Sequence, residues 1–541
     1  MYLVLNNIFY NNLFNDKIKF RTMILFTIIY NRQDIIRNIY YLKNFLMYQN
    51  KYKILKNNLF GLFYKLPFVK EKVKLEIDKF NKQMKNELIE KHTPMFKILG
   101  PEISKNGLKQ IEILNILNSI KYCGVNNHNL KCVSGAIYNN NEEEIELLKK
   151  IIPFFYKSNP LHPELFPQIS YIEKNIIKSV SKIFHGDDNV NGCVTSGGTE
   201  SIICAVYAYK NFGLQKGIKN PEIIAPISIH AAFDKAANYF GIKIHKIPIA
   251  LDNSIDFNIV KSHINNNTIM LACSAPSYAH GLIDDVESFS KLALKYNIPL
   301  HVDACLGGFL LPFLDEEYKN KIGLSNKYDF ELDGVTSISA DTHKYGYTPK
   351  GSSILMYRNE KYYKQQIFVQ SEWNGGIYAT PTIPGSRSGN NIIFTWAFLN
   401  YYGINGYREK TYKIVNALNL LKSMVRNIDG VDIIGDPKLN VLGLKSEQLN
   451  IYYISSEMKK YGWDLNELQN PPSIHLCLTL NNCDESNIKK FVENLNTCIT
   501  FCRSNNIDKD CGKSIYGSTQ KINNVEIIED LAREYIKNLS N

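Results

Sequence analysis

The sequence predicts an α/β protein: a mostly parallel sheet with helices on both faces, followed by a smaller C-terminal α+β domain. Three observations favour this class. Short apolar runs of strand type alternate with helical patterns between residues 190 and 357. Polar motifs directly follow several of these runs, and ligands of α/β proteins bind at the carboxyl ends of the strands. Beyond about residue 396 the alternation gives way to mixed helical and strand patterns.

The elements of the predicted sheet follow one another in regular order. A strand at 190–195 precedes a helix at 200–212, in which Ile202, Ile203 and Val206 recur at helical spacing. In the small domain, a strand-like run covers residues 473–480. The other expected elements are strands at 222–226, 243–249, 268–274, 299–303, 335–340 and 352–357, and helices at 231–240 and 286–296.

Composition indicates a globular protein of 541 residues, 45% hydrophobic and 21% charged, which is long enough to bury a large core. The eleven cysteines include no CxxC pair and no metal-like spacing. We therefore expect free thiols in a reducing compartment and no metal site.

The positive charge is concentrated at the N-terminus. Residues 1–70 hold eleven Lys or Arg and two Asp or Glu, so they contribute +9 of the net +11. The nearly neutral remainder argues against nucleic-acid binding. Apolar runs at 22–30 and 59–69 are too short to span a bilayer, and asparagines interrupt any signal-peptide core. Attachment of residues 1–65 to an anionic membrane surface is one interpretation; a poorly ordered extension shaped by codon bias is the other.

A lysine that follows a predicted strand is the most informative residue. Lys344 lies in SADTHKYGYTPKG at 339–351, where pyridoxal-phosphate enzymes place their Schiff-base lysine. Most lysines at strand ends are merely exposed, but this one follows Asp341 and lies between His343 and Tyr345. We expect these surroundings to lower its pKa and make its amine a nucleophile.

Two further motifs would complete a pyridoxal-phosphate site. Asp303, inside the apolar run HVDACLGG at 301–308, would need a cation such as a pyridinium nitrogen, unless it caps a helix starting at Ala304. The turn TSGGTES at 195–201 stands between a strand and a helix, where phosphate groups bind. His230 begins a predicted helix, and a lone histidine there usually only satisfies the helix terminus.

From about Leu66 to Leu539 the chain resembles the sphingosine-1-phosphate lyase family, pyridoxal-phosphate enzymes of fold type I related to the group II amino-acid decarboxylases. Lys350, six residues after Lys344, distinguishes this family from the decarboxylases. The motifs that carry the resemblance are VSGAIY (133–138), SNPLHP (158–163), CVTSGGTES (193–201), SIHAAF (228–233), HGLID (280–284), HVDACLGGFL (301–310), SISADTHKYGYTPKGSS (337–353), GGIYA (375–379), GSR (385–387), QNPPSIH (469–475) and IYG (515–517).

The resemblance implies the fold of the pyridoxal-phosphate-dependent transferases, with a sheet of the seven-stranded type. It also implies four regions: the extension (1–65), a segment contributing to dimer and active site (66–165), a large cofactor-binding domain (166–395) and a small domain (396–541). The implied cofactor contacts are Lys344 as the attachment, Asp303 at the ring nitrogen, His230 stacked on the ring, Gly198, Thr199 and His343 at the phosphate, and Ser386 at the border of the site.

The implied reaction is a retro-aldol cleavage of a phosphorylated sphingoid base to a long-chain aldehyde and phosphoethanolamine. Tyr138, His162 and Lys350 match positions around the substrate's phosphate and reacting hydroxyl. The base that takes the hydroxyl proton stays open among Tyr138, His162 and the cofactor phosphate. Tyr378 and Ser386 would border the site from the partner subunit of a homodimer, located at the endoplasmic reticulum membrane or its cytosolic surface with the catalytic domain in the cytosol.

Two rival functions are weighed against this one. A group II decarboxylase would share Lys344 and Asp303 but would need no second phosphate site, so Lys350 argues against it. A non-catalytic scaffold would not need every chemical position intact. The chain departs from the family in two places: it lacks the clear spanning helix of animal relatives, and its 274–280 loop is spelled differently, which could tune substrate choice.

Overall fold

The computed structural model describes residues 105–121, 127–250, 254–324, 327–505 and 525–539, with isolated residues between 67 and 103. The chain divides into two units. Leu130–Asn506 contains both main sheets; Met1–Asn129 with Ile507–Asn541 contains α6 (Gln110–Ile120) and α19 (Val525–Leu539). The predicted extension (1–65) and the IYG motif at 515–517 lie outside the described residues. Within the described ranges, no helix combines the length and apolarity needed to cross a bilayer.

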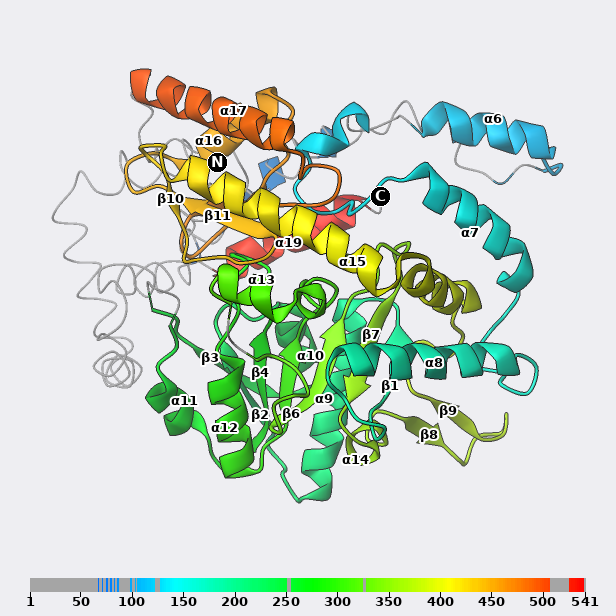
Figure 1. Cartoon of the computed structure of the whole chain (residues 1–541). Coiled ribbons are helices and arrows are strands. Elements are labelled where there is room, and N and C mark those ends of the chain that lie inside the picture. Colours follow the sequence, from blue (N-terminus) through cyan, green and yellow to red (C-terminus); the bar gives the residue numbers. More distant parts are fainter. Residues whose placement is uncertain are drawn as a thin grey trace. The chain divides into compact units, whose positions relative to one another are not determined.

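A seven-stranded sheet organises the larger unit, in the order β1-β7-β6-β5-β4-β2-β3 (Figure 1). All neighbouring strands pair in parallel except β7, which is antiparallel to both β1 and β6. The predicted mostly parallel sheet is therefore confirmed. The strands are β1 (Asn191–Thr195), β2 (Glu222–Pro226), β3 (Lys243–Ile247), β4 (Thr268–Ser274), β5 (Leu300–Asp303), β6 (Val335–Ala340) and β7 (Ser353–Tyr357).

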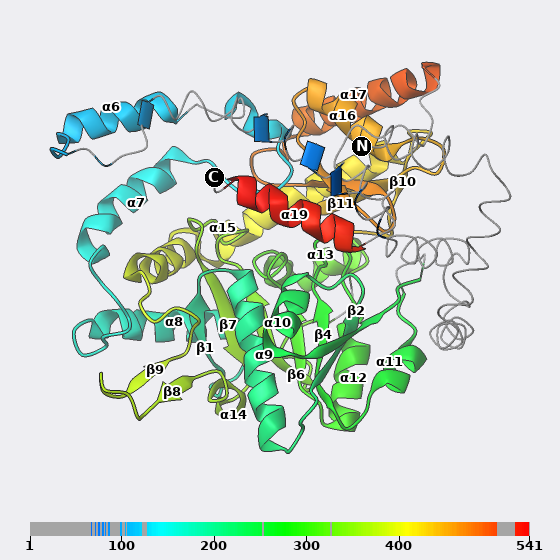
Figure 2. The ribbon, with the colours of Figure 1, turned by 180° about the vertical axis from the view of Figure 1, so that it is seen from behind.

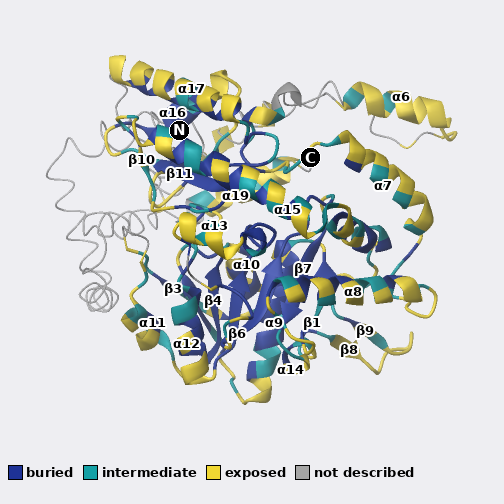
Figure 3. Cartoon of the chain, in the orientation of Figure 1, coloured by how far each residue is buried: buried dark blue, intermediate teal, exposed yellow. Residues whose placement is uncertain are grey.

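Helices cover both faces of this sheet. The opposite views show α9 (Gly198–Gln215) and α10 (Ala232–Phe240) on one face, and α8 (Pro167–Ile183) and α12 (Val286–Tyr296) on the other (Figures 1 and 2). Every residue of β4, β5, β6 and β7 is buried between these layers (Figure 3). Strands buried on both faces are mostly apolar, which explains the apolar runs of the sequence. The buried polar residues are hydrogen-bonded, as Ser337 of β6 is to His301 of β5.

The helices begin and end at residues suited to those positions. Asp285 caps α12, accepting a hydrogen bond from the Ser288 N–H, and Asn297 ends it in the left-handed conformation. Gly241 ends α10 in the same way, with φ 64°. The remaining elements of this layer are α7 (Glu142–Phe155), α11 (Phe257–His263), α13 (Glu316–Lys321), α14 (Glu360–Tyr363), the 3₁₀ turns η2 (Asn127–Cys132) and η3 (Leu311–Phe313), and the hairpin β8 (Phe368–Gln370) and β9 (Tyr378–Thr380).

A second, antiparallel sheet follows in the chain, in the order β10-β11-β13-β12. The long α15 (Gly389–Val425), interrupted by non-helical backbone at Gly403, leads into it. This α+β arrangement agrees with the smaller fold expected beyond residue 396. Its other elements are β10 (Asp432–Ile433), β11 (Val441–Lys445), α16 (Ile451–Lys460), β12 (Asn466–Leu468), β13 (Ser473–Cys477) and α17 (Glu485–Ser504).

The predicted boundaries fail mainly where side chains redirect the backbone. The expected strand at 473–480 ends at Cys477, because the Thr479 N–H bonds to the Asn482 side chain and the chain turns there. The helix expected from Glu200 already begins at Gly198, so the two glycines belong to its start. The expected strands at 222–226, 268–274 and 335–340 match β2, β4 and β6.

Candidate active site

The predicted site residues gather at the carboxyl ends of the parallel strands. Gly198 follows β1, His230 follows β2, Asp303 ends β5, and the segment Asp341–Lys344 follows β6. Since β7 runs antiparallel, the connection from β6 returns at this same edge and reaches Ser352 beside it. One edge of the sheet therefore holds the motifs that the sequence places 146 residues apart, from 198 to 344.

Lys344 forms an ion pair within its own turn. Its Nζ lies 3.0 Å from Oδ2 of Asp341, which is almost fully buried. Burial lowers the pKa of Lys344, but the charge of Asp341, followed by Cys305, Tyr138 and Asp303, outweighs it and raises that pKa above its ordinary value. The expectation of a lowered pKa was therefore wrong. The sequence signal for the raised pKa was the carboxylate of Asp341, three residues before Lys344 in the motif DTHK.

Asp341 is the site residue to which the motif analysis gave no role. Its Oδ2 also lies 3.5 Å from Nε2 of His343. Burial raises the pKa of Asp341, yet the charges of Lys344 and His343 hold it below its usual range. Asp341 therefore stays a carboxylate and fixes the position of the Lys344 amine.

His343 connects this ion pair to the predicted phosphate turn. Its Nδ1 accepts a hydrogen bond from the Ser352 N–H at 3.2 Å, so Nε2 carries the proton that faces Asp341. Burial lowers the pKa of His343, which favours the neutral ring. A Cβ at Gly197 would lie 3.2 Å from His343 Cε1, so the imidazole rests against the turn that begins α9.

The start of α9 has the form of an anion cradle. Gly197 is the N-cap and supplies no side-chain cap to this 18-residue helix, and Thr199 in its first turn is exposed. A Cβ at Gly198 would come within 2.8 Å of both Asp341 Oδ1 and Cys305 Sγ, so only glycine fits there. The donors at this helix end, the nearby amine and the buried carboxylate of Asp303 fit pyridoxal phosphate.

Asp303 is buried at the end of β5. Its Oδ1 accepts a hydrogen bond from the Cys305 N–H at 3.0 Å. Residues 305–310 form turns and no helix starts at Ala304, so the helix-cap alternative is wrong. The carboxylate stabilises a turn and keeps its place beside the lysine.

His230 lies immediately before α10. Its Nδ1 accepts a hydrogen bond from the Ala232 N–H at 3.1 Å, which is the ordinary role of a histidine at a helix start. The ring also meets Tyr278 edge to face, with centroids 6.4 Å apart and planes at 87°. Stacking of His230 on a cofactor ring stays a prediction.

Tyr138 and Lys350 lie together beside Lys344. The Lys350 Nζ is 4.7 Å from the centroid of the Tyr138 ring and 3.4 Å from the His343 carbonyl oxygen. Burial lowers the pKa of Lys350, and the charge of Lys344 lowers it further. Burial also raises the pKa of Tyr138, which keeps its phenol protonated and able to donate a hydrogen bond.

His162 does not join this pair within the described chain. It is exposed, its Nδ1 is 3.6 Å from Glu164 Oε1, and it has no hydrogen bond or ion pair to Tyr138 or Lys350. Its segment instead contacts the predicted border loop, because Asn159 Nδ2 donates to Ser386 Oγ at 3.0 Å. The hydrogen bond from Asn159 thus links the segment of His162 to the loop of Ser386, which motif spacing did not reveal.

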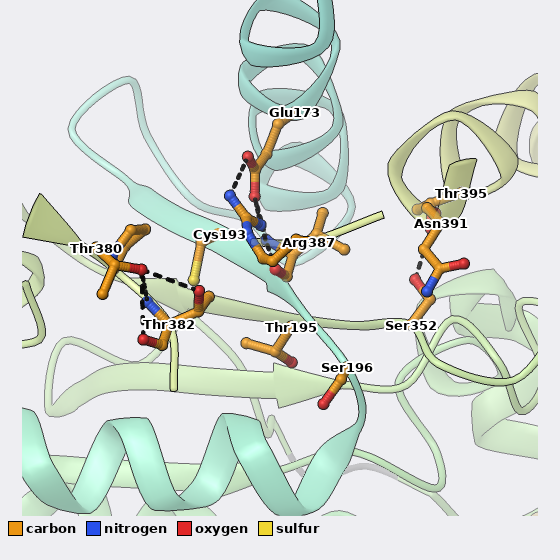
Figure 4. A network of polar contacts seen from close by, with 12 residues as sticks. Glu173, Cys193, Thr195, Ser196, Ser352, Thr380, Thr382, Arg387, Asn391 and Thr395 are labelled. Atoms are coloured by element: carbon orange, nitrogen blue, oxygen red, sulfur yellow. Dashed lines mark hydrogen bonds and ion pairs between the residues drawn. The ribbon is translucent and has the colours of Figure 1, made fainter. Parts of the chain in front are cut away.

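Arg387 anchors the loop that carries Ser386 (Figure 4). Its guanidinium binds the Glu173 carboxylate through two bonds of 2.6 and 2.9 Å and donates to the Val194 carbonyl at 2.7 Å. Both charged side chains are only 13% exposed. This bidentate pair fixes the loop against the end of β1, next to the phosphate turn.

Replacing Arg387 with alanine is expected to lower the free energy of unfolding by about 3 kcal/mol, because the Glu173 carboxylate loses its partner away from water. Denaturant unfolding measures this change. Arg503→Ala is the matched control: Arg503 pairs with Asp429 at 2.6 Å on the surface, and its loss should cost less than about 1 kcal/mol. Equal changes for the two variants would contradict the structural role.

Comparisons with known proteins agree on one family. The pyridoxal-dependent decarboxylase conserved domain matches residues 138–445. Sphingosine-1-phosphate lyase 1 of Rattus norvegicus is 42% identical over 488 residues, covering 90% of this chain and 84% of the relative. The Saccharomyces cerevisiae sphingosine-1-phosphate lyase is 38% identical, covering 79% of this chain and 73% of the relative. The solved sphingosine-1-phosphate lyase of Burkholderia pseudomallei superposes with a TM-score of 0.71 at 32% identity, covering 76% of this chain and 96% of that one. A Lactobacillus brevis glutamate decarboxylase, at 22% identity and a TM-score of 0.64, shares the fold.

Proposed function

Because this chain belongs to the sphingosine-1-phosphate lyase family, we propose that it cleaves phosphorylated sphingoid bases to a long-chain aldehyde and phosphoethanolamine. The observation that carries the proposal is the pairing of Lys350 and Tyr138 beside Lys344. A cation and a phenol next to the cofactor lysine suit a substrate that brings a phosphate of its own. A decarboxylase acting on an amino acid has no use for this second phosphate contact.

Pyridoxal phosphate, the cofactor of this family, supplies an electron sink for the carbon–carbon bond that breaks. We assign its attachment to Lys344, its ring nitrogen to Asp303 and the face of its ring to His230. Gly198, Thr199 and His343 would hold its phosphate at the start of α9, where helix N–H groups favour anions.

The side chains around Lys344 act on its amine and on the groups that would bind beside it. Asp341 holds the amine in place but also holds it protonated, so a proton must leave Nζ before the amine can act as a nucleophile. Asp303, buried at the end of β5, would pair with the ring nitrogen of the bound cofactor. Positioning of the substrate phosphate by Lys350 would align the breaking bond with the cofactor ring.

Tyr138 serves as a hydrogen-bond donor in this scheme, since its raised pKa keeps the phenol protonated. The general base is then His162 or the cofactor phosphate. His162 is exposed within one chain, and Ser386 lies on the loop next to it. We propose that a second subunit brings these residues to the site, together with Tyr378.

Exposed aromatic and apolar side chains support a homodimer. The β8–β9 hairpin presents Trp373, 57% exposed, and Ile377, 79% exposed, and α7 presents Phe154, 76% exposed. Light scattering across a range of concentrations tests the association. The four-region division and the membrane-surface role of residues 1–65, at the cytosolic side of the endoplasmic reticulum, stay predictions; vesicle flotation with and without that segment tests the membrane contact.

Replacing Lys350 with alanine separates the lyase from the decarboxylase alternative. Aldehyde release from a phosphorylated long-chain base should fall by about 10- to 100-fold in kcat/KM, the value of one charged hydrogen bond. The absorbance of the bound cofactor should not change. Lys364→Ala, which removes an exposed lysine paired with Glu360, is the control and should keep full activity.

The products that the wild-type enzyme releases decide between the two functions. Release of aldehyde and phosphoethanolamine in equal amounts establishes the lyase. Carbon dioxide release from an amino acid, at a rate that Lys350→Ala leaves unchanged, would instead establish the decarboxylase.

A further inference from the structure

The β4 loop, residues 275–283, is a closed loop next to Asp303. Its base is fastened by two hydrogen bonds, from the Ser274 N–H to Asp284 Oδ2 at 2.7 Å and from the Asp284 N–H to the Ser274 carbonyl at 3.0 Å. Inside it, the Gly281 N–H bonds to the Ser277 carbonyl at 3.0 Å, and the Ala275 N–H bonds to the Asp303 carbonyl at 2.9 Å. The loop is therefore tied to the strand that carries the cofactor carboxylate.

Three successive residues of the β4 loop contact three residues that lie side by side across the small sheet. Strand register places Asn466, His475 and Gly443 side by side across β12, β13 and β11. Tyr278 Oη accepts a hydrogen bond from Asn466 Nδ2 at 2.7 Å, and the Ala279 carbonyl bonds to His475 Nδ1 at 2.8 Å. A Cβ at Gly443 would lie 3.3 Å from the next residue, His280. The small sheet thus supports this loop residue by residue.

Tyr278 also faces the cofactor side. Its ring meets the His230 ring edge to face at 87°, and on another side it packs against His475, with centroids 5.0 Å apart and planes at 71°. Tyr278 is therefore the residue through which the small sheet reaches His230.

We propose that Tyr278 is a positioning residue of the lyase reaction: it sets the tilt of the His230 ring, and the small sheet holds Tyr278 in place through Asn466 and His475. The inference rests on the proposed function, in which His230 stacks on the cofactor. A single hydrogen bond at Nδ1 fixes one edge of that imidazole, and the perpendicular phenol limits how the remainder can turn.

The exposure of Tyr278 makes the inference testable without loss of the fold. The side chain is 46% exposed, so its truncation opens no cavity in the core. Tyr278→Ala removes the ring against His230, whereas Tyr278→Phe keeps the ring and removes only the hydroxyl bonded to Asn466. Tyr296→Ala, at an exposed tyrosine of α12, is the matched control.

Cofactor titration and visible circular dichroism of the bound cofactor give the two readouts. Tyr278→Ala should raise the dissociation constant of pyridoxal phosphate about fivefold and weaken its dichroic band, as expected for loss of one aromatic pair. Tyr278→Phe should stay within about twofold of the wild type, and Tyr296→Ala should match it. The melting temperature of the cofactor-free Tyr278→Ala protein should stay within about 2 °C of wild type.

Two results would overturn the inference: wild-type cofactor affinity and dichroism in Tyr278→Ala, or equal losses in Tyr278→Phe and Tyr278→Ala. If Tyr278→Ala does not fold, Tyr278→Leu, which keeps an apolar side chain but removes the aromatic ring, must weaken the dichroic band or the inference fails. Neither readout depends on aldehyde release. A wild-type protein that binds the cofactor but releases no aldehyde would contradict the proposed function and leave this test standing.

Discussion

Replacement of Lys344 with alanine is expected to remove aldehyde release almost completely, with kcat falling by roughly 10³- to 10⁴-fold. The variant loses the amine to which we assign the cofactor's attachment, together with any proton transfer through Nζ. No other described lysine is placed to take over: the nearby Lys350 ammonium lies over the Tyr138 ring rather than at Asp341. The measurement is aldehyde release at saturating cofactor.

The control for this variant must account for Asp341, which loses its ion-pair partner in a buried position. A denaturation curve therefore accompanies each assay, and only folded protein is compared. Lys327→Ala removes a lysine that also pairs with a nearby carboxylate, Glu331 at 2.7 Å, but on the surface, and should retain full activity. Aldehyde release by Lys344→Ala above a tenth of the wild-type rate would refute the assignment.

Asp303→Asn is expected to have the second largest effect, a fall in kcat of about 10²- to 10³-fold. The amide still accepts the hydrogen bond from the Cys305 N–H, but it carries no charge to keep the ring nitrogen protonated. This range corresponds to about 3–4 kcal/mol, the lower part of the cost of removing one partner from a buried charged pair. Rate and cofactor absorbance are measured together, since the variant should keep the cofactor and lose the rate.

Asp329→Asn is the matched control for that substitution. Asp329 is also buried, but it pairs with His185 at 2.9 Å away from the candidate site. Its amide variant tests what a buried carboxylate contributes to the fold alone. If both variants lowered kcat equally, Asp303 would have no special role at the cofactor.

Local pattern was sufficient to predict the main sheet, and insufficient to predict contacts between distant segments. The apolar and β-branched runs predicted β2, β4 and β6 because strands buried on both faces are mostly apolar. The bond between Tyr278 and Asn466 joins residues 188 positions apart, and no periodicity reports such a pair. That contact depends on how a loop and a second sheet pack, which is a tertiary property.

The candidate site divides in the same way. Lys344, His343 and Asp341 act together within one turn, so their motif could be recognised, although the sign of the Lys344 pKa shift depended on a distance. His162 and Ser386 could be named only by resemblance. Both residues are exposed, and the hydrogen bond from Asn159 to Ser386 that links their segments is seen only in three dimensions.

The single reversed strand of the main sheet has a consequence for how this site can evolve. Because β7 is antiparallel to β6, the chain turns back at the edge of the sheet that holds the candidate site. Lys344 and Lys350 therefore belong to one connection, and strand pairing anchors both of its ends. The distance between Lys344 and Lys350, the residues proposed to hold the cofactor and the substrate's phosphate, thus depends on the length of that connection. A substitution in this connection keeps the spacing of the two lysines, whereas an inserted or deleted residue would change the distance between them. The length of the β6–β7 connection is therefore expected to matter as much to the proposed reaction as the identity of its two lysines.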